Sequence, residues 1–220
     1  MAQKTSKRKR QRAPTAAAMP SYVEPMLPTP LKLPFSDPQW LFEPKLDGYR
    51  ALCFLKDGQV RFISRNRRNL TKQFPELQEI AALIKAQTAI IDGEIVALDR
   101  SGKPSFDALR HTHRKGAIVF YAFDLLYFDG EDVSQYPLVG RKEALRRILR
   151  KAPRARIRYT EHIEADGERL FSQLEAMQLE GMVCKRKDSV YAFARSKLWL
   201  KVKTASGREQ MQKRIETWGK

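Results

Sequence analysis

Cysteine and histidine are scarce in this sequence. Its 220 residues include only Cys53 and Cys184, so a disulfide-stapled fold and a four-cysteine zinc site are excluded. Three histidines occur, and His111 and His113 do not form the His-Glu-x-x-His pattern of zinc hydrolases. We interpret these two as polar loop residues, and we expect a protein of the reducing cytoplasm.

Long apolar runs are also missing. No stretch approaches the roughly 18 residues of a membrane helix, and no apolar segment follows the basic start as in a signal peptide. We therefore expect no membrane partner. The phosphate-binding motif Gly-x-x-x-x-Gly-Lys-Ser/Thr is absent, and no Gly-x-Gly-x-x-Gly follows a predicted strand. These absences argue against P-loop and Rossmann nucleotide sites.

Acidic residues are outnumbered by basic ones. The chain has 42 Lys and Arg against 25 Asp and Glu, a net charge of +17. Such a surplus favours an anionic partner, with nucleic acid as the first candidate. Apolar residues make up 42% of the chain, which is enough for a core. The length suits one large domain or two small ones.

The N-terminal region differs in composition from the rest. Residues 1–19 carry six Lys or Arg without periodicity, which predicts a flexible basic tail. This tail either aids solubility or contacts phosphates without sequence preference. Residues 20–38 contain six prolines and are expected to run extended over a surface, held down by Leu31, Leu33 and Phe35.

The remainder predicts an α+β fold with mainly antiparallel strands. Asp57-Gly58 is a strong hairpin signal, and strict strand–helix alternation is absent. The predicted strands are 50–55, 59–64, 89–98, 117–126, 182–185 and 198–203, and the predicted helices are 74–85, 141–151, 168–179 and 210–218. In the third helix Leu170, Phe171, Leu174 and Met177 should face inward, with Gly181 as the C-cap.

Charged residues gather around Lys45, between Glu43 and Arg50. A neutral lysine is a nucleophile, and neighbouring cations favour that form. Taken alone, the cluster could be an ordinary turn with solvated charges. Further charged or aromatic segments occur at 92–94, 123–124, 180–185 and 199–203. Together they provide cations, two carboxylates suited to Mg²⁺ and an aromatic ring, the groups needed to bind a nucleoside triphosphate and attack its phosphorus.

The order of these segments resembles that of the covalent nucleotidyltransferases. It is most similar to the ATP-dependent DNA ligases, and among them to the ligase domain of bacterial end-joining ligases. Six motifs carry the resemblance: Lys45-x-Asp47-Gly48-x-Arg50, Ser64-Arg65-Asn66, Asp92-Gly93-Glu94, Tyr121-Ala122-Phe123-Asp124-Leu125-Leu126, Glu180-Gly181-x-x-x-Lys185 and Trp199-Leu200-Lys201-Val202-Lys203. The resemblance implies a ligase-type nucleotidyltransferase domain over residues 20–204, with two mainly antiparallel sheets flanked by helices, followed by a short extension over 205–220.

The resemblance also implies roles for individual residues. Lys45 would attack the α-phosphorus of ATP and form a lysine–AMP intermediate. The other implied ATP contacts are Glu43 at adenine, Phe123 stacked on its ring, Arg50 and Arg65 at ribose and phosphate, Glu94 at the ribose, and Lys185, Lys201 and Lys203 at the phosphates. Glu94 and Glu180 would hold Mg²⁺, and Arg65 is also a candidate for the 5′-phosphate of a nick.

In one respect the sequence departs from the family pattern. Family ligases continue into an oligonucleotide-binding (OB) domain, whereas residues 204–220 are too few for a five-stranded barrel. Three hypotheses therefore stay open: a minimal ligase, a subunit whose OB function comes from a partner, and a DNA- or nucleotide-binding module without turnover. An RNA ligase or capping-type enzyme is the alternative reaction. The motifs keep all of their charged residues, which argues against a binding module without turnover.

The expected partner is nicked or broken DNA. Residues 141–158 hold nine Lys or Arg and a single acidic residue, Glu143. As a helix and loop, this segment could lie along a phosphate backbone. The alternative is an ordinary solvated helix face.

Overall fold

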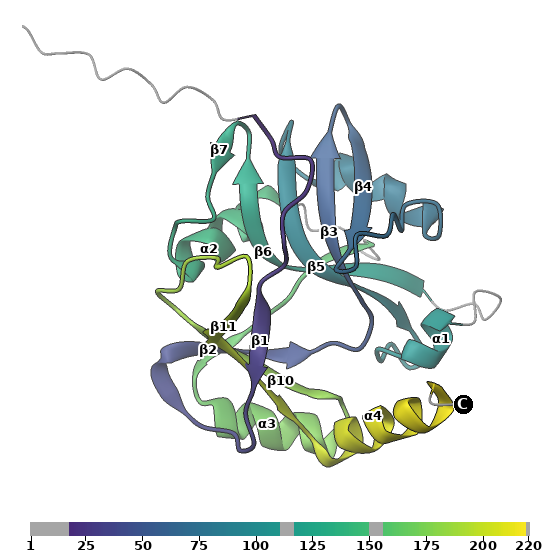
Figure 1. Ribbon diagram of the computed structural model, residues 1–220, viewed down its shortest axis with the longest axis vertical. Coiled ribbons are helices and arrows are strands. Elements are labelled where there is room, and N and C mark those ends of the chain that lie inside the picture. The colour runs from purple at the N-terminus through teal and green to yellow at the C-terminus, as the bar shows by residue number, and fades with distance from the viewer. Residues whose placement is uncertain (1–17, 111–116, 150–155, 219–220) are drawn as a thin grey trace, which may run out of the picture.

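The computed structural model describes residues 18–110, 117–149 and 156–218, which form two sheets with helices on their outer sides (Figure 1). The strands are β1 (Leu27–Pro30), β2 (Asp37–Lys45), β3 (Tyr49–Lys56), β4 (Gln59–Ser64), β5 (Ala89–Leu98), β6 (Ala117–Phe128), β7 (Glu131–Asp132), β8 (Ile157–Tyr159), β9 (Ile163–Ala165), β10 (Gly181–Arg186) and β11 (Arg195–Lys203). The helices are the 3-10 helix η1 (Pro75–Leu83), α1 (Phe106–Arg110), α2 (Leu138–Ile148), α3 (Gly167–Ala176) and α4 (Ala205–Trp218).

Both sheets are mainly antiparallel, as predicted. One has the order β1-β11-β10-β2-β9, and only its β1–β11 pair is parallel. The other has the order β4-β3-β5-β6-β7, and β8 adds to β6 in parallel. The part of the chain that the structure describes contains no closed barrel. It also contains no helix long and apolar enough to cross a membrane.

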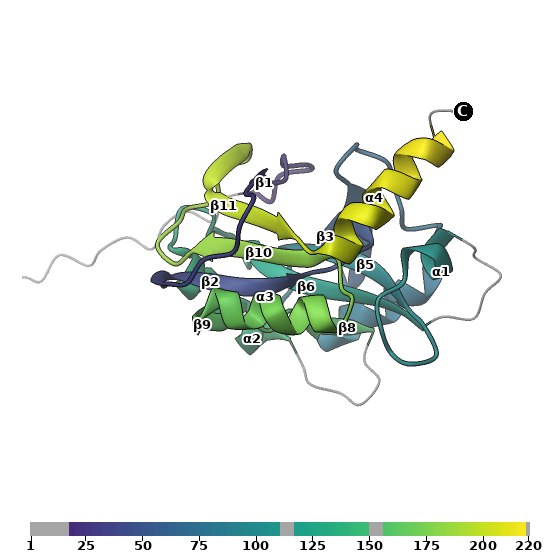
Figure 2. The same ribbon diagram turned by 90° about the horizontal axis from the view of Figure 1, so that it is seen from below.

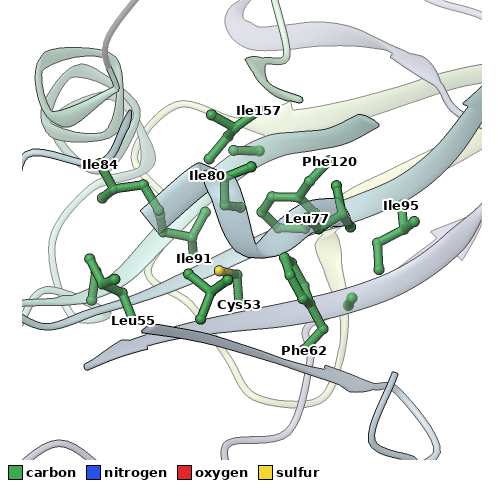
Figure 3. Packing of buried hydrophobic residues seen from close by; sticks show 14 of the residues in the cluster. Cys53, Leu55, Phe62, Leu77, Ile80, Ile84, Ile91, Ile95, Phe120 and Ile157 are labelled. Carbon is green, nitrogen blue, oxygen red and sulfur yellow. The ribbon is translucent and has the colours of Figure 1, made fainter. Parts of the chain in front are cut away.

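The central strands are apolar on both faces because the six-stranded sheet is covered on both sides. In β3, Cys53 and Leu55 join a cluster under η1 and α2, whereas Leu52 and Phe54 join a second cluster that also contains Trp199 of β11. Figure 3 shows the first cluster, with η1 laid across the sheet. A third cluster packs α3 against the other sheet. The two sheets are therefore held face to face by side chains that alternate along β3.

Several predicted elements are confirmed, and their bounds differ by a few residues. The predicted strand 89–98 coincides with β5, and the predicted helix 210–218 lies within α4, which projects beyond the end of β11 (Figure 2). The predicted helix 74–85 is a 3-10 helix with Pro75 at its start. Residues 150–151 of the second predicted helix lie outside the described residues, as do residues 1–17 of the tail.

Two predictions about α3 are wrong. Met177 is 50% exposed, because the helix ends at Ala176 before that residue can turn inward. The left-handed residue after the helix is Gln178, with φ of 57°, and not Gly181. Gly181 instead opens β10, where a Cβ would lie 2.2 Å from the carbonyl oxygen of Val202. Glycine is thus required there for close approach of two strands.

The proline-rich segment is extended, as predicted, and one of its three predicted anchors, Phe35, packs against Trp40 and Phe42. Leu31 and Leu33 are exposed, at 37% and 74%. A second anchor, which was missed from the sequence, is Met26, whose side chain is buried and whose backbone nitrogen donates to the Tyr191 hydroxyl at 2.8 Å. The segment also forms β1, which pairs only with β11 at the sheet edge, where proline is tolerated.

Candidate active site

A cleft of about 640 Å³ is lined by residues of both sheets. It brings together most of the predicted site residues: Glu43, Lys45, Arg50, Arg65, Glu94, Phe123, Lys185 and Lys201. The two remaining ones, Glu180 and Lys203, lie next to Lys45. Glu180 Oε2 is 2.6 Å from Lys45 Nζ, and Glu180 Oε1 is 3.5 Å from Lys203 Nζ.

Strand register explains how distant motifs meet on one face of the five-stranded sheet. Lys45 of β2 is paired across β10 Gly181 with β11 Lys203. The next row on the same face joins Glu43 and Lys201 through Val183. Side chains in directly paired positions share a face of the sheet, so the nucleophile candidate and the two motif lysines point the same way.

The loop after Lys45 is packed directly against β5. A Cβ on Gly48 would lie 2.1 Å from the carbonyl oxygen of Ile95, so only glycine allows this approach. Arg50, just beyond the loop, is paired with Glu94 across β3 and β5. The tight turn therefore brings Lys45 of the five-stranded sheet close to Glu94 of the six-stranded sheet.

Carboxylates gather beside Lys45. Burial raises the pKa of Glu94 to about 7; Lys45 and Arg50 oppose this shift, and the nearby Glu180 and Asp47 add to it. A divalent cation would relieve this repulsion, and Mg²⁺ typically binds one or two carboxylates together with substrate phosphates. Glu94 and Glu180 therefore fit a Mg²⁺ that is shared with a nucleotide. No protein-only cluster of three metal-ligating side chains occurs in the described ranges.

Phe123 forms an aromatic wall of the cleft. The centre of its ring lies 4.2 Å from Lys185 Nζ and 4.5 Å from Arg50 Cζ, and the residue is 8% exposed. Lys185 Nζ also lies 4.2 Å from the Trp199 ring. Burial lowers the pKa of Lys185 to about 8, although Glu43 opposes that shift. The structure thus places Lys185 against aromatic rings and a carboxylate, in contrast to the more open Lys201 and Lys203.

Arg50 forms an ion pair with Asp92 inside the protein. Its guanidinium binds Asp92 at 2.6 and 2.5 Å, and the Tyr191 hydroxyl donates to the same carboxylate at 2.5 Å. Burial alone would lower the pKa of Arg50, but Asp92 raises it. Arg50 therefore faces the cleft as a fixed charge. Arg65, by contrast, is exposed on the cleft lining.

Two basic residues of α2 were misassigned from the sequence. Arg141 and Lys142 are buried and cannot lie along a DNA backbone as predicted for residues 141–158. Arg141 binds Asp124, and Lys142 binds Glu43. Residues 150–155 of that segment lie outside the described residues. One feature of the sequence could have indicated the Arg141 pair. Asp124 lies in an almost entirely apolar strand, and a buried carboxylate requires a cationic partner.

Comparisons with known proteins agree with this geometry. Residues 25–203 match the family model for the ATP dependent DNA ligase domain. The multifunctional non-homologous end joining protein LigD of Pseudomonas aeruginosa is 34% identical over 188 residues, which cover 84% of this chain and 22% of that protein. The SPbeta prophage-derived DNA ligase-like protein LigB of Bacillus subtilis is 32% identical over 82% of this chain and 67% of that protein. The chain thus spans about a fifth of the LigD protein.

Solved structures give the same result. The ligase domain of Mycobacterium tuberculosis LigD is 33% identical and superposes with a TM-score of 0.71, over 82% of this chain and 59% of that one. A mycobacterial DNA ligase D complexed with ATP and MES gives a TM-score of 0.72 at the same identity, over 82% of this chain and 60% of that one. The chain belongs to the ATP-dependent DNA ligase family and carries the adenylation domain of that family.

Proposed function

We propose that Lys45 is the nucleophile of a self-adenylation reaction with ATP. A bond forms between Lys45 Nζ and the α-phosphorus, and the bond from that phosphorus to the bridging oxygen breaks, so pyrophosphate leaves with the electron pair. The carboxylate of Glu180 is the nearest acceptor for the proton that Nζ must lose, at 2.6 Å. The observation that carries the proposal is this Lys45–Glu180 pair at the cleft, together with Lys203, which shares a row of the sheet with Lys45.

Cations on the same sheet face support the phosphate assignment. Burial lowers the pKa of Lys201, and Lys45, Arg195 and Lys203 lower it further. This crowding of positive charge is relieved when an anion binds between the side chains. Fixed charges aimed at the transferring phosphate stabilise the transition state without reorganisation. Mg²⁺ held by Glu94 and Glu180 would supply further charge neutralisation at the phosphates.

The base end of the cleft favours adenine. The Phe123 ring is part of the cleft lining and would stack against the base, and the Glu43 carboxylate can accept a hydrogen bond from an exocyclic amino group. Guanine presents a carbonyl oxygen at the corresponding position, which a carboxylate repels. This argues for an ATP-using ligase over a capping-type guanylyltransferase.

We further propose that the AMP is passed to the 5′-phosphate of a nick or break in DNA, which is then sealed. The net charge of +17 supports a polyanionic acceptor. Arg65 is exposed on the cleft lining and can grip a terminal phosphate with two donors. LigD family members are named for end joining, which agrees with broken ends as substrate.

Nick sealing with two substrates separates the steps. We expect wild-type protein to seal an ordinary nick with ATP and Mg²⁺, and Lys45→Ala to seal only a nick that already carries 5′-AMP. Lys56→Ala, an exposed lysine of the β3–β4 hairpin, is the matched control and should behave as wild type. Wild-type protein that seals neither nick would favour the binding-only alternative, and a preference for nicked RNA would favour the RNA ligase alternative. A separately added OB domain tests partner dependence.

A further inference from the structure

Lys142 of α2 contacts three residues of the cleft lining from behind. Its Nζ atom donates to Glu43 Oε1 at 2.5 Å, to the Thr160 carbonyl oxygen at 3.3 Å and to the Phe123 carbonyl oxygen at 3.4 Å. Glu43, Phe123 and Thr160 line the cleft, whereas Lys142 does not. One ammonium group thus joins β2, β6 and the segment that follows β8.

The ammonium groups of two lysines fix the Glu43 carboxylate. Oε1 is bound by Lys142, and Oε2 lies 2.6 Å from Lys185 Nζ. Burial alone would raise the pKa of Glu43, but Lys142 and then Lys185 outweigh it and lower the pKa. Each carboxylate oxygen has two lone pairs, so Glu43 still has acceptor capacity for a ligand. Its orientation, however, is set from within the protein.

Burial makes this arrangement rigid. The side chains of Lys142 and Glu43 are 2% and 3% exposed, and Lys142 Nζ lies 4.6 Å from the centre of the Tyr159 ring. A buried charge without its partner is strongly disfavoured, so the two groups hold each other in one geometry. Lys142 is therefore too well shielded for the DNA contact that its basic helix suggested.

We propose that Lys142 is a positioning residue for nucleobase recognition, which holds the Glu43 carboxylate and the Phe123 backbone in place for adenine. This inference rests on the proposed function and adds a residue that never touches the nucleotide. Without the Lys142 ammonium, Glu43 turns toward Lys185 and its free lone pairs no longer face the base. Discrimination between bases then falls, while the chemistry at Lys45 continues.

The test compares Lys142→Met with Arg147→Met, an exposed residue of the same helix. Formation of the covalent adduct is followed with ATP and with GTP over a range of concentrations. For Lys142→Met we expect the KM for ATP to rise about tenfold and the preference for ATP over GTP to fall about tenfold. The kcat should stay within about threefold of wild type. Arg147→Met should match wild type in all three quantities.

A double variant and a second single variant test whether Lys142 acts through Glu43. If Lys142 acts through Glu43, the double variant Lys142→Met/Glu43→Gln has the base preference of Glu43→Gln alone, whereas multiplied effects would overturn it. Lys142→Gln, whose shorter neutral side chain does not bridge the three acceptors, is made in case Lys142→Met does not fold. A folded variant of either kind with wild-type KM and base preference refutes the role of Lys142. Absence of an adduct in wild-type protein refutes instead the proposed function.

Discussion

The guanidinium of Arg141 and the carboxylate of Asp124 form a bidentate pair that is completely buried, with both N–O distances at 2.8 Å. Arg141 also donates through Nη1 to the carbonyl oxygens of Tyr136 and Ser189, at 2.6 and 2.8 Å. Asp124 follows Phe123 directly in β6. This pair therefore fixes α2 to the strand that carries the aromatic wall of the cleft.

Removal of one partner of this pair should be costly. In Arg141→Met the Asp124 carboxylate stays buried without its partner, so we expect the free energy of unfolding to fall by about 3–5 kcal/mol. Urea unfolding measures this change. Arg147→Met on the exposed side of α2 should stay within about 0.5 kcal/mol of wild type. A loss in Arg141→Met no larger than in this control would show that the pair does not hold the fold.

Phe123 should matter for both ATP binding and stability. Phe123→Leu keeps an apolar side chain but removes the stacking ring, so ATP binding should weaken by about 1–3 kcal/mol. Phe123→Ala should in addition destabilise the fold by about 3–5 kcal/mol, because the ring packs against Trp199 in the second cluster. Titration calorimetry and urea unfolding separate the two effects. Unchanged ATP affinity in Phe123→Leu would assign the ring to the core alone.

Glu94 should make stability depend on pH. Its pKa is raised from 4.5 to about 7, chiefly by burial, so the folded state disfavours the ionised form. Stability is then lost as pH rises through this window, and Glu94→Gln escapes the loss. We expect the Tm of Glu94→Gln to gain a few degrees on wild type between pH 5 and pH 8. Mg²⁺ at pH 8 should raise the Tm of wild type more than that of the variant, and a pH-independent Tm difference would contradict this account.

Two glycines should respond to alanine in opposite directions. Gly181→Ala places a Cβ 2.2 Å from the Val202 carbonyl oxygen at φ of 152°, so β10 and β11 must separate and stability should fall by more than about 1 kcal/mol. Gly140 lies in α2 with open space around its Cβ position. Gly140→Ala should therefore stabilise by about 0.4–1 kcal/mol. Thermal unfolding of both variants checks the signs, and equal effects would refute the close approach.

Much of the fold was predictable because local patterns and tertiary packing agree. Residues 89–98 are largely apolar, as expected for a central strand that is covered on both faces. The predicted strand has the same bounds as β5. Lys201 and Lys203 are two residues apart on one strand, so their side chains lie on the same face of the sheet. The site was predictable as a set of motifs, but their meeting depended on β10 pairing with both β2 and β11, which no local pattern encodes.

The interior ion pairs were not predictable from local composition. Arg141 and Lys142 sit in a basic helix, where charged residues are normally exposed. Their partners, Asp124 and Glu43, come from two different strands of the two sheets, so only the tertiary structure shows that the helix turns these residues inward. For the same reason Leu31 and Leu33 were wrongly expected to be anchors, since alternation alone does not show which face is covered.

The most direct test of the central claim is the intact mass of the protein after incubation with ATP and Mg²⁺, beside Lys45→Ala. Lys45 is partly exposed, and Glu180 keeps a second cation, Lys203 Nζ, at 3.5 Å, so we expect Lys45→Ala to leave the fold intact. We predict that wild-type protein gains one AMP and that Lys45→Ala gains none. An adduct that persists in a folded Lys45→Ala protein would contradict the assignment of Lys45 as nucleophile.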